Sequence, residues 1–348
     1  MKDLRLLQDI KNQVNSLCAV LSHQLGDGHP ALLEAAGLLR DARKIVITGM
    51  GASLYASLPL QYQLAAQGVN CLVVDSSELL YYQQPLCADA VVILVSRSGE
   101  SAELAKLLPQ VNGLASRTVA VTNEPRSTLA VGADLVLTIR SFEDDKMAIQ
   151  SYTGTLLTLM LLASCVAGDL DNVREEMKYV IAMISTLIND DLDGSRSWDG
   201  FLEPERPIYL LGRGPSYASA LAGSLLFNEI AKHQAIGVTC GNFRYGSVEL
   251  VDANFRGIIF APHGRTRELN LALAAALERF GGKILVVGPQ SEEHNTLQFI
   301  DVPTSEKLAP LAEIIPVQFG ALYLAKLKGL PVGKFRYITQ VTRDEVAF

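Results

Sequence analysis

Residues Val91–Lys106, which read VVILVSRSGESAELAK, decide the fold of this chain. The first five residues are apolar and predict a short buried strand, and Ala102–Leu108 is typical of a helix. Between them, Ser96–Ser101 (SRSGES) places hydroxyl groups and a glycine at the start of the helix. The first backbone N–H groups of a helix have no intrahelical partners and carry partial positive charge, so they favour the binding of an anion. The stretch therefore predicts a phosphate-binding loop. The alternative is an ordinary helix cap, in which Ser98 or Ser101 binds no ligand.

The order of strand, glycine-containing loop and helix occurs twice along the chain. The segment KIVIT–GMGAS, which begins at Lys44, is matched by PIYLL–GRGPS, which begins at Pro207. The SRSGESAE loop is likewise matched by APHGRTRE, which begins at Ala261. The second copies follow the first by about 163 and about 165 residues, so the sequence indicates a duplicated domain.

Strands alternate with helices within each copy, which is typical of βαβ units around a parallel sheet. We therefore expect an α/β protein with two doubly wound, flavodoxin-like domains in tandem, each an αβα sandwich. The polar segment Asp190–Glu205 contains Gly194, Gly200 and Pro204 and is the expected boundary. The predicted domains are residues 1–195 with the leading helices and residues 196–348 with a C-terminal tail.

Composition excludes several classes of function. The chain has 348 residues and a formal net charge of −7, which argues against nucleic acid and against an anionic membrane surface as partners. The longest apolar run, Leu156–Ala167, is too short to span a membrane and is expected to belong to a core helix, which the sequence predicts over Tyr152–Ala167. No signal peptide is evident, and the five scattered cysteines are typical of reduced core residues, so we expect a cytoplasmic protein. No Cys/His spacing suits zinc, and no cofactor is implied.

Together, GMGAS, SRSGES and the repeat resemble the tandem sugar-isomerase (SIS) domain family. Members include the isomerase half of glucosamine-6-phosphate synthase, sugar-phosphate deaminases, and deglycases that cleave phosphorylated sugar–amino acid conjugates. The segments VDSSELLYY, LLGRGPSYASALAGSLLFNEIA and GNFRYGSVELVD also have counterparts in the family. The resemblance extends from about Leu32 to Glu345. It implies a 6-phosphorylated sugar or amino sugar as substrate and a homodimer with sites at the subunit interface.

The resemblance also assigns site residues. Two loops match the substrate-binding loops of the family, and they supply Gly51, Ala52 and Ser53, and Ser96, Arg97, Ser98 and Ser101. Arg97 replaces the usual glutamine of the phosphate loop and adds charge for a dianion. Glu229 matches the catalytic glutamate, which acts as a base on C1 and C2 of the open-chain sugar. Its neighbours are apolar, so burial is expected to raise its pKa toward that of a general base; the alternative is a solvated helix charge.

Five residues depart from the synthase pattern. A lysine three positions before the glutamate is Leu226, and a Thr-Lys pair before the long helix is Ile149-Gln150. The C-terminal lysine that forms an imine with the ketose corresponds to Gln340, which we still expect in the substrate site. The ring-opening histidine is replaced by Tyr245, which either donates a proton to the ring oxygen or is a packing tyrosine. The glutaminase domain is absent from this sequence, so synthase activity is not expected.

These residues leave three hypotheses. The first is an enzyme that releases an amine from a 6-phosphorylated amino sugar or sugar–amino acid conjugate, with Glu229 as base. Loss of the lysines fits such a reaction, because a substrate that already carries nitrogen needs no imine with the protein. The second is an aldose–ketose phosphosugar isomerase, and the third is a non-catalytic sugar-phosphate sensor. No DNA-binding segment precedes the first domain of this sequence, and the presence of Glu229 favours an enzyme over a sensor.

Overall fold

A computed structural model describes residues 4–190, 198–203 and 205–345. Contacts divide the chain into two compact units. One unit holds Asn12–Met177 and the chain from Phe335 onward, and the other holds Lys178–Lys334 and the chain before Asn12. The predicted domain boundary at residues 195/196 lies outside the described residues.

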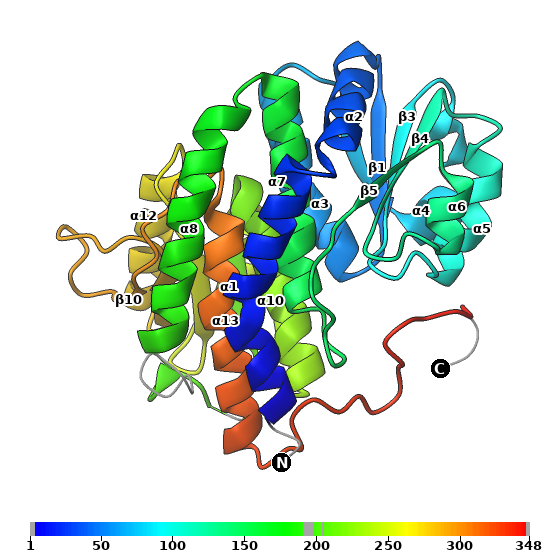
Figure 1. Ribbon diagram of the computed structural model, residues 1–348. Coiled ribbons are helices and arrows are strands. Elements are labelled where there is room, and N and C mark those ends of the chain that lie inside the picture. Colours follow the sequence, from blue (N-terminus) through cyan, green and yellow to red (C-terminus); the bar gives the residue numbers. More distant parts are fainter. Residues whose placement is uncertain (1–3, 191–197, 204, 346–348) are drawn as a thin grey trace. The chain divides into compact units, whose positions relative to one another are not determined.

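The first unit contains a sheet of five parallel strands in the order β2-β1-β3-β4-β5. The strands are β1 (Ile45–Gly49), β2 (Cys71–Asp75), β3 (Val91–Val95), β4 (Arg117–Thr122) and β5 (Leu135–Thr138). One face is covered by α2 (His29–Asp41) and α3 (Ala52–Ala66), and α7 (Gln150–Ala167) packs against both of these helices. The other is covered by α4 (Ser76–Tyr81), α5 (Ala102–Val111) and α6 (Thr128–Gly132) (Figure 1). The predicted doubly wound arrangement is confirmed.

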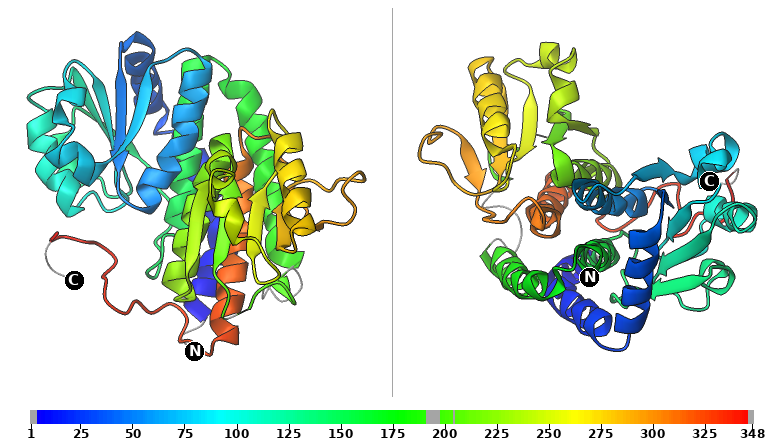
Figure 2. Two further views of the ribbon diagram at one scale, coloured as in Figure 1. Left: turned by 180° about the vertical axis from the view of Figure 1, so that it is seen from behind. Right: turned by 90° about the horizontal axis from the view of Figure 1, so that it is seen from above.

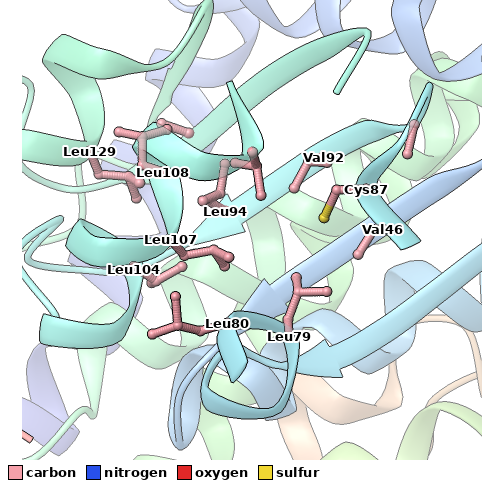
Figure 3. Close-up of a cluster of buried hydrophobic side chains, with 13 residues drawn as sticks. Val46, Leu79, Leu80, Cys87, Val92, Leu94, Leu104, Leu107, Leu108 and Leu129 are labelled. Atoms are coloured by element: carbon pink, nitrogen blue, oxygen red, sulfur yellow. The ribbon is translucent and has the colours of Figure 1, made fainter. Parts of the chain in front are cut away.

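The helix that follows the SRSGES loop is held against the sheet by leucines. Leu104, Leu107 and Leu108 are buried on one face of α5, because residues three and four positions apart share a helix face. They belong to one cluster with Val92 and Leu94 of β3 (Figure 3). Since β3 and α5 are both fixed in this core, the loop between them begins and ends at fixed points.

The second unit repeats the topology. Its five parallel strands run in the order β10-β9-β8-β6-β7, which is the same succession viewed from the other edge. The strands are β6 (Ile208–Gly212), β7 (Ala235–Thr239), β8 (Arg256–Phe260), β9 (Lys283–Val287) and β10 (Gln298–Ile300). Its helices are α10 (Tyr217–Ile230), α11 (Cys240–Phe243), α12 (Arg267–Arg279) and α13 (Ala309–Leu327). Helices α10 and α13 pack together, whereas α12 (yellow in Figure 2) packs on β8 and β9. The duplication inferred from the sequence is therefore confirmed.

Helix α7 is longer than the apolar stretch that indicated it. It is the one helix among the described residues that is long and apolar enough to cross a membrane, and 94% of it is buried in the protein. It therefore serves as a core helix, as expected from the sequence. The remaining long helices are α1 (Leu4–Leu25) and α8 (Leu170–Asp190).

Candidate functional site

Two of the predicted loops begin at neighbouring strands of the first sheet. Strand β1 pairs with β2 on one side and β3 on the other, and Gly49 lies opposite Val95. The loops that follow, Gly51–Ser53 and Ser96–Ser101, therefore leave the same edge of the sheet. Ligands of doubly wound sheets bind at the carboxyl ends of strands where the winding reverses, and β1/β3 is that point here.

The first of these loops turns directly into α3. Gly51 is the residue before the helix and has a φ of +52°, a backbone conformation that favours glycine. Ala52 and Ser53 then form the first turn of the helix and are partly exposed. The first turn of α3 therefore lies at the same edge of the sheet as the SRSGES loop.

The serine hydroxyls of the second loop converge. The Ser96 side chain is buried, and its Oγ lies 3.1 Å from Oγ of Ser101 and 3.5 Å from Oγ of Ser98. The Gly99 N–H donates to Ser96 Oγ (3.1 Å), and the Glu100 N–H donates to Ser98 Oγ (3.2 Å). Hydroxyls gathered in this way at the start of a helix can donate to one anion together.

The helix-cap alternative for Ser101 does not describe this loop. Ser101 occupies the position before α5, but its hydroxyl makes no capping hydrogen bond. The Ala102 N–H, the first of the helix, donates instead to the carbonyl oxygen of Thr342 in the C-terminal tail (3.0 Å). The Ser101 hydroxyl consequently faces Ser96 rather than the helix backbone.

Gly99 has a backbone conformation that favours glycine. Its φ is +62°, and a Cβ at this position would lie 2.0 Å from Oγ and 2.4 Å from Cβ of Ser127. We expect Gly99→Ala to destabilise the protein by about 2–4 kcal/mol, because backbone strain and overpacking add. Gly68→Ala is the matched control: φ is +78° there, but no atom lies within 4 Å of the added carbon, so only strain of about 1 kcal/mol is expected. Urea denaturation measures both, and equal losses would contradict the steric account.

The C-terminal tail brings Gln340 to the SRSGES loop. Arg97 Nη2 donates to the backbone oxygen of Gln340 (3.4 Å), and Gln340 Nε2 donates to the backbone oxygen of Asp144 (3.1 Å). Further along the tail, Glu345 accepts from Lys106 Nζ (3.0 Å) and from the Tyr81 hydroxyl. Spacing in the sequence could not have placed a residue so far from the loop beside Arg97.

Glu229 lies near the end of α10 in the second unit. Its side chain is partly buried, and burial raises the pKa of its carboxyl to about 7, although the nearby Lys232 ammonium lowers it somewhat. Leu226, one turn earlier, is buried. A carboxyl with a pKa near neutrality is suited to accept and return a proton at physiological pH.

Tyr245 follows α11 and is 86% exposed. Among the described residues, no side chain forms a hydrogen bond or ring contact with its phenol, and only its backbone N–H is bonded, to the Asn242 carbonyl oxygen (2.9 Å). Packing within its own chain therefore does not explain this tyrosine. Its assignment as a ring-opening acid stays a prediction.

Two buried carboxyls were not singled out from the sequence. Asp144 accepts from the N–H groups of Gln150 (2.8 Å) and Ser151 (3.1 Å) at the start of α7, and burial raises its pKa. Glu313 of α13 is completely buried and accepts from the hydroxyls of Ser216 (2.9 Å) and Ser219 (2.7 Å). An acid inside an otherwise apolar helical run was the signal for Glu313.

The fold and both loops agree with a known family. Residues 38–165 and 201–325 match the model of the SIS domain. The chain belongs to this family and carries two SIS domains in tandem.

A curated protein shares nearly a third of its residues with this chain over the aligned segment. The chain is 31% identical over 304 residues to glutamine–fructose-6-phosphate aminotransferase (isomerizing) of Pyrococcus horikoshii, covering 85% of this chain and 51% of that protein. It thus spans about half the length of this relative.

Two solved structures share the fold over almost the whole chain. The C-terminal domain of glucosamine-fructose-6-phosphate aminotransferase from Francisella tularensis superposes with a TM-score of 0.83 at 20% identity, covering 93% of this chain and 96% of that one. Glucosamine-6-phosphate deaminase from Thermotoga maritima superposes with a TM-score of 0.79 at 19% identity, covering 97% of this chain and 99% of that one.

Proposed function

We propose that this protein is a phosphosugar-processing enzyme that releases an amine from a 6-phosphorylated amino sugar or sugar–amino acid conjugate. The observation that carries the proposal is Glu229, a partly buried carboxyl with a pKa of about 7 on the helix where the SIS family carries its base. The converging hydroxyls of Ser96, Ser98 and Ser101 support the binding of a phosphate.

The proposed reaction needs one proton relay and one water. Glu229 removes the proton from the nitrogen-bearing carbon of the open-chain sugar, which is next to the carbonyl, and an enolamine forms. It then returns the proton to the former carbonyl carbon, so that the nitrogen-bearing carbon becomes an imine. Water adds to the imine carbon, the C–N bond breaks, and the products are a free amine and a phosphosugar carbonyl. The phosphate is held meanwhile by the serine loop and by Arg97.

The missing lysines support amine release over amine transfer. Leu226 and Gln340 stand where the synthase pattern has lysines, and neither side chain can form an imine with a ketose. A substrate that brings its own nitrogen does not require such an imine. Several relatives with this fold act on 6-phosphates of amino sugars or ketoses, including the Thermotoga deaminase.

An aldose–ketose isomerase is the second candidate, because Glu229 alone is sufficient to move a proton between C1 and C2.

We also propose a cytoplasmic homodimer. The exposed phenol of Tyr245, which lacks a partner among the described residues of its own chain, supports a contact with a second subunit.

The deciding experiment measures products from a panel of 6-phosphates of glucosamine, fructoselysine, glucoselysine and fructose. The proposal expects an amine and a phosphosugar in equal amounts from at least one nitrogen-containing substrate. Turnover of fructose 6-phosphate to an aldose, without amine release from any other substrate, would favour the isomerase. Binding without turnover of any member would leave the sensor hypothesis.

A further inference from the structure

A cavity of about 410 Å³ adjoins the phosphate loop within the first unit. Its walls come from the segments after β3, β4 and β5 and from the C-terminal tail. Arg97 and Ser98 belong both to the loop and to this wall, whereas Ser96 and Ser101 do not line the cavity. The size is within the range of small-molecule sites. Gln340, like Arg97 and Ser98, is expected to bind the substrate and lines this cavity, whereas the charged residues at positions 124, 126, 143 and 343 have no role in that expected site.

Charged groups dominate the cavity wall. Arg97, Arg126 and Arg343 line it together with four carboxylates. Two of the carboxylates are already engaged. Glu100 accepts from the Thr128 N–H (2.7 Å) and hydroxyl (2.9 Å), and Asp144 accepts from the backbone at the start of α7.

Four other charged side chains of the wall, two arginines and two glutamates, are exposed. Across residues 4–190, 198–203 and 205–345, no hydrogen bond or ion pair involves the side chains of Arg126, Arg343, Glu124 or Glu143. The guanidinium groups and the carboxylates therefore border one cavity without pairing with each other. Two free cations and two free anions around one space are complementary to a ligand that carries both signs.

We propose that this cavity binds the zwitterionic head group of an α-amino acid. The ligand carboxylate pairs with Arg126 and Arg343, and its ammonium pairs with Glu124 and Glu143. A guanidinium presents paired N–H groups that match a carboxylate, and this geometry favours an α-amino acid over a simple amine. The head group comes either from the amino-acid part of a substrate whose phosphate lies on the serine loop or from a free amino acid. The first source rests on the proposed function, whereas the second does not.

Three sugar conjugates test whether the amino-acid head group belongs to the substrate or to a free amino acid. The 6-phosphate of fructose joined to the ε-nitrogen of lysine carries the complete head group. The 6-aminohexanoate conjugate lacks only the ammonium, and the 1,5-diaminopentane conjugate lacks only the carboxylate. If the substrate supplies the head group, the lysine conjugate has the lowest KM, by about tenfold to a hundredfold over either analogue.

Variants test whether this preference originates in the cavity. Arg126→Gln/Arg343→Gln should remove the preference for a carboxylate, and Glu124→Gln/Glu143→Gln should remove the preference for an ammonium. Arg336→Gln is the matched control, because Arg336 is an exposed arginine of the same tail that does not line the cavity. It should keep both preferences.

Calorimetry with free lysine tests whether the cavity binds a free amino acid. Because this measurement needs no turnover, it is informative even if the protein releases no amine. Binding that is lost in Arg126→Gln/Arg343→Gln but kept in Ser96→Ala/Ser101→Ala and Arg336→Gln would support a cavity for a free amino acid. If the charge variants change neither the conjugate preference nor the binding of lysine relative to Arg336→Gln, the proposal is wrong.

Discussion

Glu229→Gln is expected to lower kcat for amine release by about a hundredfold to ten-thousandfold. Glutamine has nearly the same shape but cannot accept a proton, and positioned acid–base groups contribute rate factors of this size. The SRSGES loop, which is the proposed phosphate site, lies on other elements, so KM should change much less than kcat. Steady-state kinetics on the best substrate of the panel measures both constants.

The pH profile makes this test specific. Because burial raises the pKa of Glu229 to about 7, the carboxylate needed as base is formed only as pH rises through that value. For the wild type, kcat should therefore rise with pH, reach half of its maximum near pH 7 and level off about one pH unit above that value. In Glu229→Gln this rising limb should be absent.

Glu268→Gln is the control, since Glu268 is an exposed glutamate at the start of α12 in the same unit. It should keep the wild-type rate and pH profile. A Glu229→Gln protein that retains the rising limb, or loses less than about threefold in kcat, would assign the proton transfer to another group.

The sequence predicted those features that depend on neighbouring residues. Runs such as VVILV become buried central strands because both faces of a parallel sheet are covered, and the loop after each strand is placed by the winding rule. The serine loop of the first sheet was therefore predicted between its strand and its helix, whereas the strand order that places it at β1/β3 came from the structure. Helix α7 was also anticipated, although the apolar run Leu156–Ala167 covers only part of it.

Features that depend on distant pairs were not predictable. The hydrogen bond from the Ala102 N–H to the Thr342 carbonyl joins the first helical turn after the loop to the far end of the chain, and no local pattern encodes it. The charge pattern of the cavity has the same origin, because Arg126 and Arg343 meet only once the tail has folded back. Propensity and spacing describe segments, whereas these contacts depend on tertiary packing.

Glu313→Gln is expected to change how stability depends on pH. Glu313 is fully buried in α13, and burial raises the pKa of its carboxyl from 4.5 to about 8 despite the hydroxyls of Ser216 and Ser219, which favour its charged form. At neutral pH the folded protein therefore holds this carboxyl protonated, whereas the unfolded chain has released the proton.

The sign of the effect follows from proton linkage. Between pH 4.5 and about 8 the folded state binds one more proton at Glu313 than the unfolded state does. Each pH unit in this window then lowers the free energy of unfolding by up to about 1.4 kcal/mol, and the loss ends above pH 8. Glutamine fills the same space without titrating, so Glu313→Gln should approach wild-type stability near pH 5 and exceed it increasingly toward pH 8.

Glu229 also affects the pH dependence of stability, over a pH range that overlaps with that of Glu313. The variant Glu229→Gln distinguishes the two contributions. The pKa of Glu229 is about 7, so its contribution changes little between pH 7 and 8, whereas that of Glu313 still declines. Thermal unfolding of the wild type, Glu229→Gln and Glu313→Gln at half-unit steps from pH 5 to 9 distinguishes the two. The advantage of Glu313→Gln over the wild type should continue to grow between pH 7 and 8, while that of Glu229→Gln stays nearly constant. A difference between Glu313→Gln and the wild type that does not vary with pH would show that Glu313 is charged in the folded protein, stabilised by its two serine hydroxyls.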